Sequence, residues 1–291
     1  MKLKEIQERF HKELDAIYGK DEVRSFFYLL IEELFNFNRL KLALDPEKTI
    51  TKSEVDTILK ALTRLKGQEP IQYITGETEF YGLPFKVNEN TLIPRPETEE
   101  LVNLIIENTK EKIEKDRSFS ILDIGTGTGC IAITLAKNLP NAKVYAVDVS
   151  AEAIEKAKEN AALNNVEVAF IETDILDKES WGVKFSALEF DIIVSNPPYV
   201  RELEKQQMKP NVLNNEPHLA LFVEDENPLL FYKAISKFAD RKLQSSGELY
   251  FEINEYLGKE MIALLEENNF RNIELKQDFF RKDRMLKGIK K

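Results

Sequence analysis

The chain has 291 residues, of which 43% are hydrophobic, so it can bury a substantial core and lacks the composition of a disordered protein. Its 51 acidic and 41 basic residues give a formal net charge of -10, which argues against broad electrostatic binding to nucleic acid. A single cysteine excludes an internal disulfide framework, and the two histidines lie far apart in the sequence, so we expect no metal site.

The amino-terminal stretch is charged and has a helical period, with neither the apolar core nor the cleavage site of a signal peptide. No apolar run approaches the roughly 20 residues of a membrane span. We therefore expect a cytoplasmic protein that does not interact with membranes.

Residues 1–75 predict a small helical domain, because apolar residues recur there every three or four positions. One such run comprises Leu3, Ile6, Phe10, Leu14 and Ile17. Residues 76–93 have a different pattern, in which aromatic and aliphatic residues flank turn formers such as Gly82 and Pro84. This pattern predicts a β-hairpin linker between two domains.

Residues 94–291 alternate between predicted strands and predicted helices. The predicted strands are 119–125, 142–150, 166–174, 190–196, 247–254 and 271–279. The predicted helices are 96–113, 130–139, 151–164, 227–243 and 259–268. Such alternation predicts an α/β domain with a mostly parallel sheet that is covered by helices on both faces.

The first of these strands leads into a glycine-rich loop, D-I-G-T-G-T-G. The loop motif comprises Asp123, Gly125, Thr126, Gly127, Thr128 and Gly129. Glycines permit positive φ and let a ligand approach the backbone, and the helix that follows presents free N–H groups. A glycine turn could merely connect the strand to the helix. The spacing D-x-G-x-G-x-G favours a ligand-binding loop, and it differs from the G-x-G-x-x-G of dinucleotide binders.

Acidic residues end the next two predicted strands. Asp148 can accept hydrogen bonds from both ribose hydroxyls of a nucleoside, or it could cap the following helix, a role that Ser150 fills better. Asp174 ends the third strand. Because ligands of open α/β sheets bind at the carboxyl ends of the strands, these residues indicate a nucleoside site.

The loop and its spacing resemble the S-adenosylmethionine (SAM)-dependent methyltransferases of the Rossmann-like class. The resemblance implies a mostly parallel seven-stranded sheet and SAM as the cofactor. It also implies that Asp123 and the 125–129 loop hold the methionine part of SAM, that Asp148 holds the ribose, and that Asp174 lies near the adenine amine.

The fourth strand ends in Asn196-Pro197-Pro198-Tyr199, which we expect at the same sheet edge. A nitrogen conjugated to a carbonyl or an aromatic ring is a poor nucleophile because its lone pair is delocalised. The Asn196 side-chain oxygen and the Pro197 carbonyl can accept both of its protons, while proline stiffens the backbone and Tyr199 packs on the planar group. The motif predicts methyl transfer to such a nitrogen, with Asn196 also near the cofactor, and leaves adenine, guanine and glutamine open.

Two further stretches are informative, namely "EPIQYITGETEF" (69–80) and "LIPRPETEELV" (92–102). Together with the glycine loop and "NPPY", they resemble the release factor glutamine methyltransferases of the HemK/PrmC type. The stretches "EPHLAL" (216–221) and "FFRKDRMLKG" (279–288) also match that family. The resemblance covers the chain from about residue 69 to its end. It implies methylation of the side-chain amide nitrogen (N5) of the glutamine in the Gly-Gly-Gln motif of class I peptide chain release factors. The helical domain (1–75) would then recognise the protein substrate. The linker (76–93) and the methyltransferase domain (94–291) follow it in the sequence.

In this interpretation Asn196, Pro197, Pro198 and Tyr199 hold the glutamine amide. Arg95 and Glu97 lie on a segment that flanks the active site and are candidate substrate-binding residues, although the same residues also suit a helix start. We expect a monomer, and no stable nucleic-acid partner.

Three other functions stay open from the sequence alone. A sister enzyme that methylates a glutamine of a ribosomal protein would share the fold and the Asn-Pro-Pro-Tyr tip. An N6-adenine or N2-guanine nucleic-acid methyltransferase is disfavoured by the acidic balance and by the lack of a basic stretch interleaved with aromatic residues. A SAM-binding regulator without catalysis would have no need of two acceptors beyond the methyl group.

Overall fold

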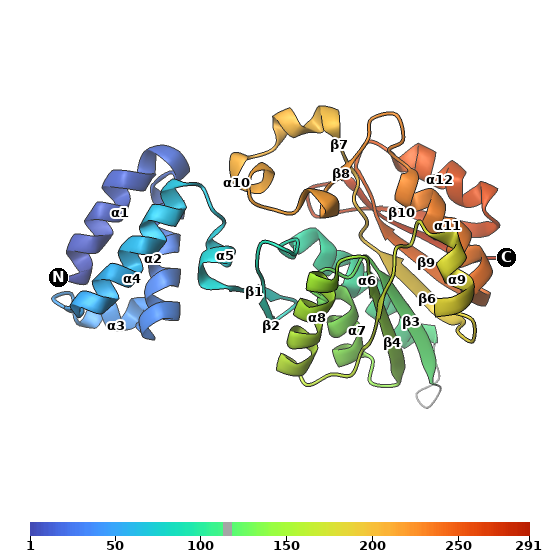
Figure 1. Cartoon of the computed structure of the whole chain (residues 1–291), viewed down its shortest axis with the longest axis horizontal. Coiled ribbons are helices and arrows are strands. Elements are labelled where there is room, and N and C mark those ends of the chain that lie inside the picture. Colours follow the sequence, from blue (N-terminus) through green and yellow to red (C-terminus); the bar gives the residue numbers. More distant parts are fainter. Residues whose placement is uncertain (113–117) are drawn as a thin grey trace. The chain divides into compact units, whose positions relative to one another are not determined.

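The computed structural model describes residues 1–112 and 118–291. The chain divides into two compact units, one formed by Met1–Glu77 with Lys209–Asn215 and the other by Thr78–Met208 with Glu216–Lys291 (Figure 1). Segment 209–215, which the sequence assigned to the second domain, thus groups with the first unit, where Asn215 Nδ2 donates to Gln68 O at 3.2 Å.

The first unit is helical, and its core consists of the apolar faces of its longer helices. Its helices are α1 (Leu3–Tyr18), α2 (Lys20–Phe35), α3 (Arg39–Leu44), α4 (Lys52–Lys66), α5 (Ile71–Thr75) and the short α10 (Pro210–Leu213). Leu3, Ile6, Phe10 and Leu14 are fully buried, as their spacing predicts, whereas Ile17 is exposed. A capping box begins α4, in which the side chains and backbones of Thr51 and Glu54 bond to each other.

The second unit is built on a seven-stranded sheet. Its strands are β3 (Phe119–Ile124), β4 (Ala142–Asp148), β5 (Ala169–Glu172), β6 (Phe190–Ser195), β9 (Leu243–Glu252), β10 (Phe270–Gln277) and β11 (Asp283–Lys290). They lie in the order β10-β11-β9-β6-β3-β4-β5. The five strands from β9 to β5 pair in parallel. Strand β11 pairs antiparallel with β9, and β10 pairs antiparallel with β11. The predicted α/β fold with a mostly parallel sheet is confirmed.

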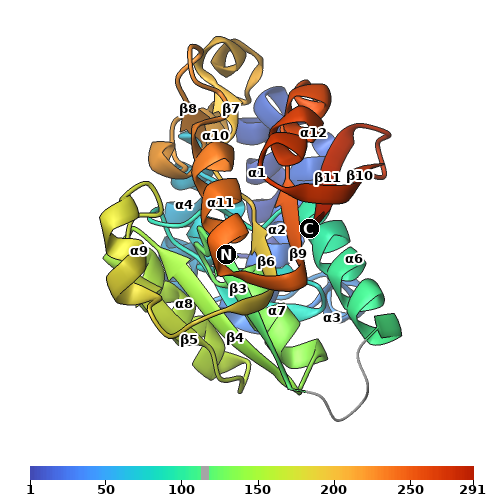
Figure 2. The same cartoon turned by 90° about the vertical axis from the view of Figure 1, so that its right-hand side faces the viewer.

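Helices cover both faces of this sheet (Figures 1 and 2). On one face pack α6 (Pro96–Lys112), α7 (Cys130–Asn138) and α8 (Ala151–Leu163). On the other pack α9 (Lys178–Lys184), α11 (Leu230–Lys242) and α12 (Gly258–Glu267). The last residue of the helix predicted over 96–113 lies outside the described residues.

Each central strand supplies both cores, because successive side chains of a strand point to opposite faces. Ile121 of β3 packs with α6 and α7, whereas its neighbour Leu122 packs with α11 and α12. Ile192 and Ile193 of β6 divide in the same way. Burial on both faces explains why these strands read as continuous apolar runs in the sequence.

Shorter elements surround the carboxyl edge of the sheet. A hairpin of β1 (Glu77–Phe80) and β2 (Leu83–Lys86) precedes α6, and the parallel pair β7 (Val200–Arg201) and β8 (Phe222–Val223) follows β6. The 3₁₀ segments η1 (Glu202–Gln207) and η2 (His218–Ala220) lie between β7 and β8 in the sequence. Among the described residues no helix has the length and apolar character of a membrane span, and no cluster of His, Cys, Asp and Glu is arranged to hold a metal ion.

Candidate active site

The glycine loop joins β3 to α7 in a conformation that requires glycine. Gly125, Gly127 and Gly129 all have positive φ, at 76°, 54° and 82°. The loop is anchored to the neighbouring strand, because the N–H groups of Gly125 and Thr126 both donate to Val147 O, at 2.8 and 2.9 Å. The loop backbone is therefore fixed at the carboxyl edge of the sheet.

Asp123, at the end of β3, is fully buried beneath this loop. Its Oδ2 accepts a hydrogen bond from Thr126 Oγ1 at 2.6 Å. Burial raises the pKa of Asp123 to about 7, and the hydrogen bond from Thr126 opposes that rise. The carboxylate thus supports the loop from below.

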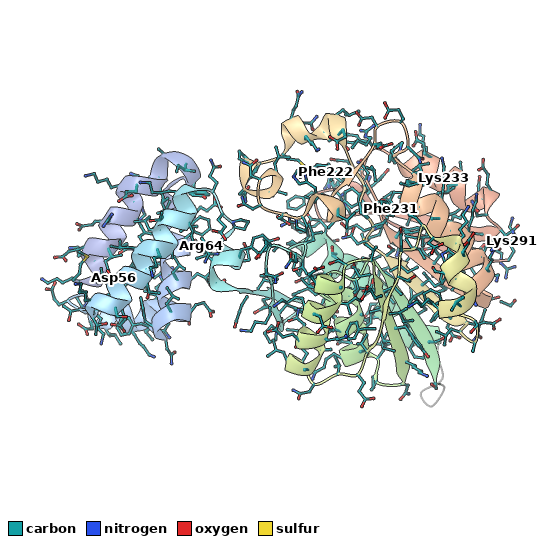
Figure 3. The ribbon with its side chains drawn as sticks, viewed as in Figure 1. Asp56, Arg64, Phe222, Phe231, Lys233 and Lys291 are labelled. Carbon is teal, nitrogen blue, oxygen red and sulfur yellow. The ribbon has the colours of Figure 1, made fainter. Side chains whose placement is uncertain are left out.

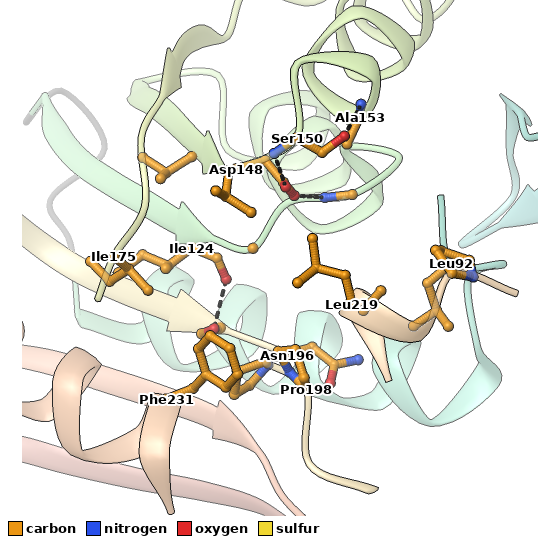
Figure 4. A pocket seen from close by; sticks show the side chains of 18 of the residues that line it. Leu92, Ile124, Asp148, Ser150, Ala153, Ile175, Asn196, Pro198, Leu219 and Phe231 are labelled. Carbon is orange, nitrogen blue, oxygen red and sulfur yellow. Dashed lines mark hydrogen bonds between the residues drawn. The ribbon is translucent and has the colours of Figure 1, made fainter. Parts of the chain in front are cut away.

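Asp148 ends β4 and faces the loop. Its Oδ2 accepts a hydrogen bond from Gly127 N at 2.8 Å and its Oδ1 accepts one from Ser150 N at 3.0 Å (Figure 4). Burial raises the pKa of this carboxyl, and the backbone N–H groups oppose the rise. Ser150, as expected from the sequence, is the residue that caps α8, through Ala153 N at 3.1 Å.

A cavity of about 250 Å³ lies over the carboxyl ends of β3, β4 and β6. Seven residues that the sequence singled out line it, namely Gly125, Gly127, Asp148, Asp174, Asn196, Pro197 and Pro198. Apolar side chains, including Ile175, Leu219 and Phe231, form much of the remaining wall (Figure 4). Figure 3 shows where Phe231 lies in the whole chain. The cavity thus combines a mainly apolar wall with a few polar groups, as small-molecule sites usually do.

A second, smaller cavity of about 50 Å³ shares part of this wall. Asn196 and Pro197 line both cavities, together with Leu92 and Ala220. Arg95, Tyr199 and Glu252 line the smaller cavity alone. The tip after β6 (residues 196–199) therefore lines two cavities of unequal size, and Figure 4 shows Asn196 and Pro198 at the larger one.

An ion pair ties together two distant stretches of chain at these cavities. Glu216, whose side chain is 1% exposed, accepts a hydrogen bond from Arg95 Nη2 at 2.6 Å and another from Ile93 N at 3.3 Å. The segment after the hairpin and the segment before η2 are thereby held together. Arg95 is thus a partner of Glu216 as well as a lining residue of the smaller cavity.

Five predicted site residues are absent from the described residues that line the two cavities. Asp123, Thr126 and Thr128 are buried, and Gly129 packs against α8. Glu97 lies at the start of α6, and it too is not among the described residues that line the cavities. The first four shape the loop rather than the surface that a ligand would touch.

Three residues that line the smaller cavity or bond to its lining residues received no individual role from the sequence. Thr98 and Glu216 lie inside stretches that resemble the family, and the resemblance assigns no separate role to either. Glu252 lies between Phe251 and Ile253, and such a carboxylate inside an apolar strand was the available signal. Its buried side chain accepts hydrogen bonds from Thr98 Oγ1 (2.6 Å) and Tyr199 Oη (3.1 Å).

Comparison with known protein families finds two matching family models. Residues 5–76 match the PrmC N-terminal domain, and residues 102–215 match the methyltransferase small domain. A solved structure of a methyltransferase from Pyrococcus furiosus superposes with a TM-score of 0.50 at 18% identity, covering 82% of this chain and 99% of that chain. This structural likeness bears on the fold alone.

Two curated relatives are similar over nearly the whole chain, and both are described as release factor glutamine methyltransferase. That of Flavobacterium psychrophilum is 53% identical over 99% of this chain and 99% of its own length. That of Bacteroides thetaiotaomicron is 43% identical over 94% of this chain and 95% of its own length.

Proposed function

Because the chain belongs to the release factor glutamine methyltransferase family, we propose that it transfers a methyl group from SAM to the side-chain amide nitrogen of the glutamine in the Gly-Gly-Gln motif of class I peptide chain release factors. The observation that carries this proposal is the position of Asn196 and Pro197, which line both the larger and the smaller cavity. A donor in one cavity and an amide in the other would meet at these two residues.

The larger cavity suits SAM. Asp148 already accepts two backbone N–H groups, but each carboxylate oxygen keeps a free lone pair for a ribose hydroxyl. Gly125 and Gly127 allow close approach to the loop backbone, and Phe231 with Ile175 offers apolar surface to an adenine ring. When bound, SAM supplies an electrophilic methyl group on its sulfonium sulfur.

Asn196 and Pro197 would orient the nucleophile. The Asn196 Oδ1 and Pro197 O atoms are acceptors, and together they can bind both N–H protons of a primary amide. This arrangement favours the pyramidal nitrogen that carries its lone pair, and it stabilises the positive charge that develops there during transfer. Holding the nitrogen in line within about 3 Å of the carbon that it attacks could contribute several kcal/mol.

Tyr199 is held rigidly enough to act as a wall for the amide. Its hydroxyl donates to Glu252 Oε1 at 3.1 Å, and its backbone oxygen accepts from Asn254 Nδ2, also at 3.1 Å. Burial and the neighbouring Glu252 raise the pKa of Tyr199, so the phenol stays neutral. A fixed neutral ring can pack on a planar amide.

The helical unit is our candidate for binding the release factor, because the target is a protein and none of the described residues that line the two cavities belongs to this unit. We further propose that the enzyme acts in the cytoplasm as a monomer, without a stable nucleic-acid partner. Light scattering of the purified protein would test the monomer.

The experiment that tests the function mixes the purified protein with methyl-labelled SAM and an unmodified class I release factor. A release factor with Gln→Ala at its Gly-Gly-Gln motif is the matched control. Label on the first substrate and none on the second supports the proposal. Label on neither, with label on a ribosomal protein or on nucleic acid, would keep the chemistry and refute the substrate.

A further inference from the structure

A buried chain of hydrogen bonds runs behind Asn196. Asn196 Nδ2 donates to Thr98 Oγ1 at 3.2 Å, and Thr98 Oγ1 donates to Glu252 Oε2 at 2.6 Å. Thr98 is 2% exposed and Glu252 is 1% exposed, so bulk water does not compete for these bonds. The chain connects β9 and the start of α6 to the tip after β6.

Counting protons along this chain fixes which end of the Asn196 amide faces Thr98. An ionised Glu252 only accepts hydrogen bonds, so the single hydroxyl proton of Thr98 must be donated to it. Thr98 can then only accept from Asn196, which requires the amide NH₂ on that side. The Asn196 Oδ1 atom is left to accept a bond from a ligand in the cavities.

The second oxygen of Glu252 is also engaged. Tyr199 donates its hydroxyl proton to Oε1, and Arg284 Nη1 lies 3.5 Å from the same hydroxyl. Arg284 is itself paired with Asp278, with 3.2 Å between Nε and Oδ2. Both carboxylate oxygens of Glu252 therefore receive protons from groups that have a single proton to give.

We propose that Thr98 and Glu252 are positioning residues that hold the Asn196 amide with its oxygen toward the acceptor nitrogen, an inference that rests on the proposed function. Neither residue touches the reacting atoms. Their effect passes through the orientation of one amide, because the reversed amide would direct an NH₂ group at the NH₂ group of the glutamine.

Protonation of Glu252 would reverse the chain. A carboxylic acid with its proton on Oε2 donates to Thr98, and Thr98 then donates to the Asn196 oxygen. Burial raises the pKa of Glu252, while the Thr98 hydrogen bond and the Arg284 charge oppose that rise. The titratable and charged groups that face Glu252 are Arg284 of β11, Tyr199 of the tip, Glu97 of α6, Tyr232 of α11 and Cys130 of α7.

The test compares Thr98→Val with Thr98→Ser, which keeps the hydroxyl. We expect Thr98→Val to lower kcat about 100-fold, as for the loss of one positioned hydrogen-bond group, with SAM affinity unchanged. Thr98→Ser should restore most of that loss. Thr109→Val, in the same helix, is the matched control, because the buried Thr109 hydroxyl has no hydrogen-bond partner among the described residues. It should leave kcat unchanged.

A pH profile separates positioning from mere support of the fold. In the wild type and in Thr98→Ser, kcat should fall as the pH is lowered through the raised pKa of Glu252. Thr98→Val should lack this acidic limb, because protonation no longer reaches the amide. Equal kcat for Thr98→Val and Thr98→Ser, or the same acidic limb in both, would overturn the proposal.

Neutron diffraction of the deuterated wild-type protein gives a readout without substrate. The expected result is ND₂ of Asn196 toward Thr98 and the Thr98 deuteron toward Glu252; the reversed assignment would refute the inference. An inactive wild type would refute the proposed function, and the amide orientation would still decide the role of Thr98 and Glu252.

Discussion

Replacing Gly129 by alanine should destabilise the second unit through two separate effects. Gly129 has φ of 82°, in the left-handed region, where a side chain costs about 1–2 kcal/mol. An added Cβ would also lie 2.8 Å from Ile133 Cδ1 and 3.1 Å from Ala157 Cβ. Ile133 and Ala157 are fully buried, so neither has room to move away, and overpacking of this kind costs about 1–3 kcal/mol.

The two effects together predict a loss of about 2–5 kcal/mol in the free energy of unfolding for Gly129→Ala. Gly127→Ala is the matched control, because φ there is 54° but no described residue beyond its chain neighbours has an atom within 4 Å of the added Cβ. It should lose only the backbone contribution, about 1–2 kcal/mol. Calorimetry should show a Tm about 2–12 °C lower for Gly129→Ala than for Gly127→Ala. Equal Tm values would refute the idea that close packing of α8 on the loop demands glycine at position 129.

Three further predictions concern single carboxylates and the amide tip. Asp148→Ala should raise the Kd for SAM in calorimetric titration at least tenfold, since hydrogen bonds to a charged group contribute about 1.5–3 kcal/mol each; an unchanged Kd would rule out the ribose assignment. Asn196→Ala should abolish methyl transfer with the SAM Kd nearly unchanged, and a parallel loss of SAM binding would count against its role as an acceptor for the substrate. Asp123 has a folded-state pKa of about 7, above its ordinary value, so its contribution to stability is present below pH 4 and is lost as the pH rises through 7. Urea unfolding of the apoprotein should therefore show Asp123→Asn gaining stability relative to the wild type between about pH 4 and 7, by at most about 1.4 kcal/mol per pH unit; a constant difference would contradict the raised pKa.

Much of the fold could be predicted because the relevant signals are local. The continuous apolar runs of β3 and β6 and the glycine spacing after β3 required no knowledge of distant residues. Segment 209–215 could not be assigned in this way, because its grouping with the helical unit depends on contacts such as that between Asn215 and Gln68, far apart in the sequence. Ile17 has the spacing of the apolar face of α1, yet it is exposed. Periodicity shows which face of a helix is apolar, but not how much of that face other elements cover.

In the candidate site, too, residues with a local signal could be predicted and residues that depend on distant contacts could not. Residues that follow strand ends, such as Asp148 and Asn196, could be predicted because parallel strands end at one edge of the sheet. The roles of Glu216 and Glu252 could not be predicted, because each depends on a partner more than 100 residues away in the sequence. The partner of Glu216 is Arg95, and that of Glu252 is Thr98. A buried acid is visible in the sequence, but its partner is not.

The Asn160 side chain of α8 makes three hydrogen bonds to backbone groups, using both of its N–H donors and its oxygen. It accepts from Lys86 N at 2.7 Å and donates to Lys86 O at 3.0 Å and to Thr128 O at 2.9 Å. One fully buried amide therefore joins the end of the hairpin to the glycine loop, and the hairpin leads directly into residues 89–92 of the cavity wall. The glycine loop and residues 89–92 are thus fixed to each other by the fold itself, so ligand binding in the cavity would cost little conformational entropy. Neither aspartate, which lacks donors, nor glutamine, which is longer by one carbon, could reproduce this junction.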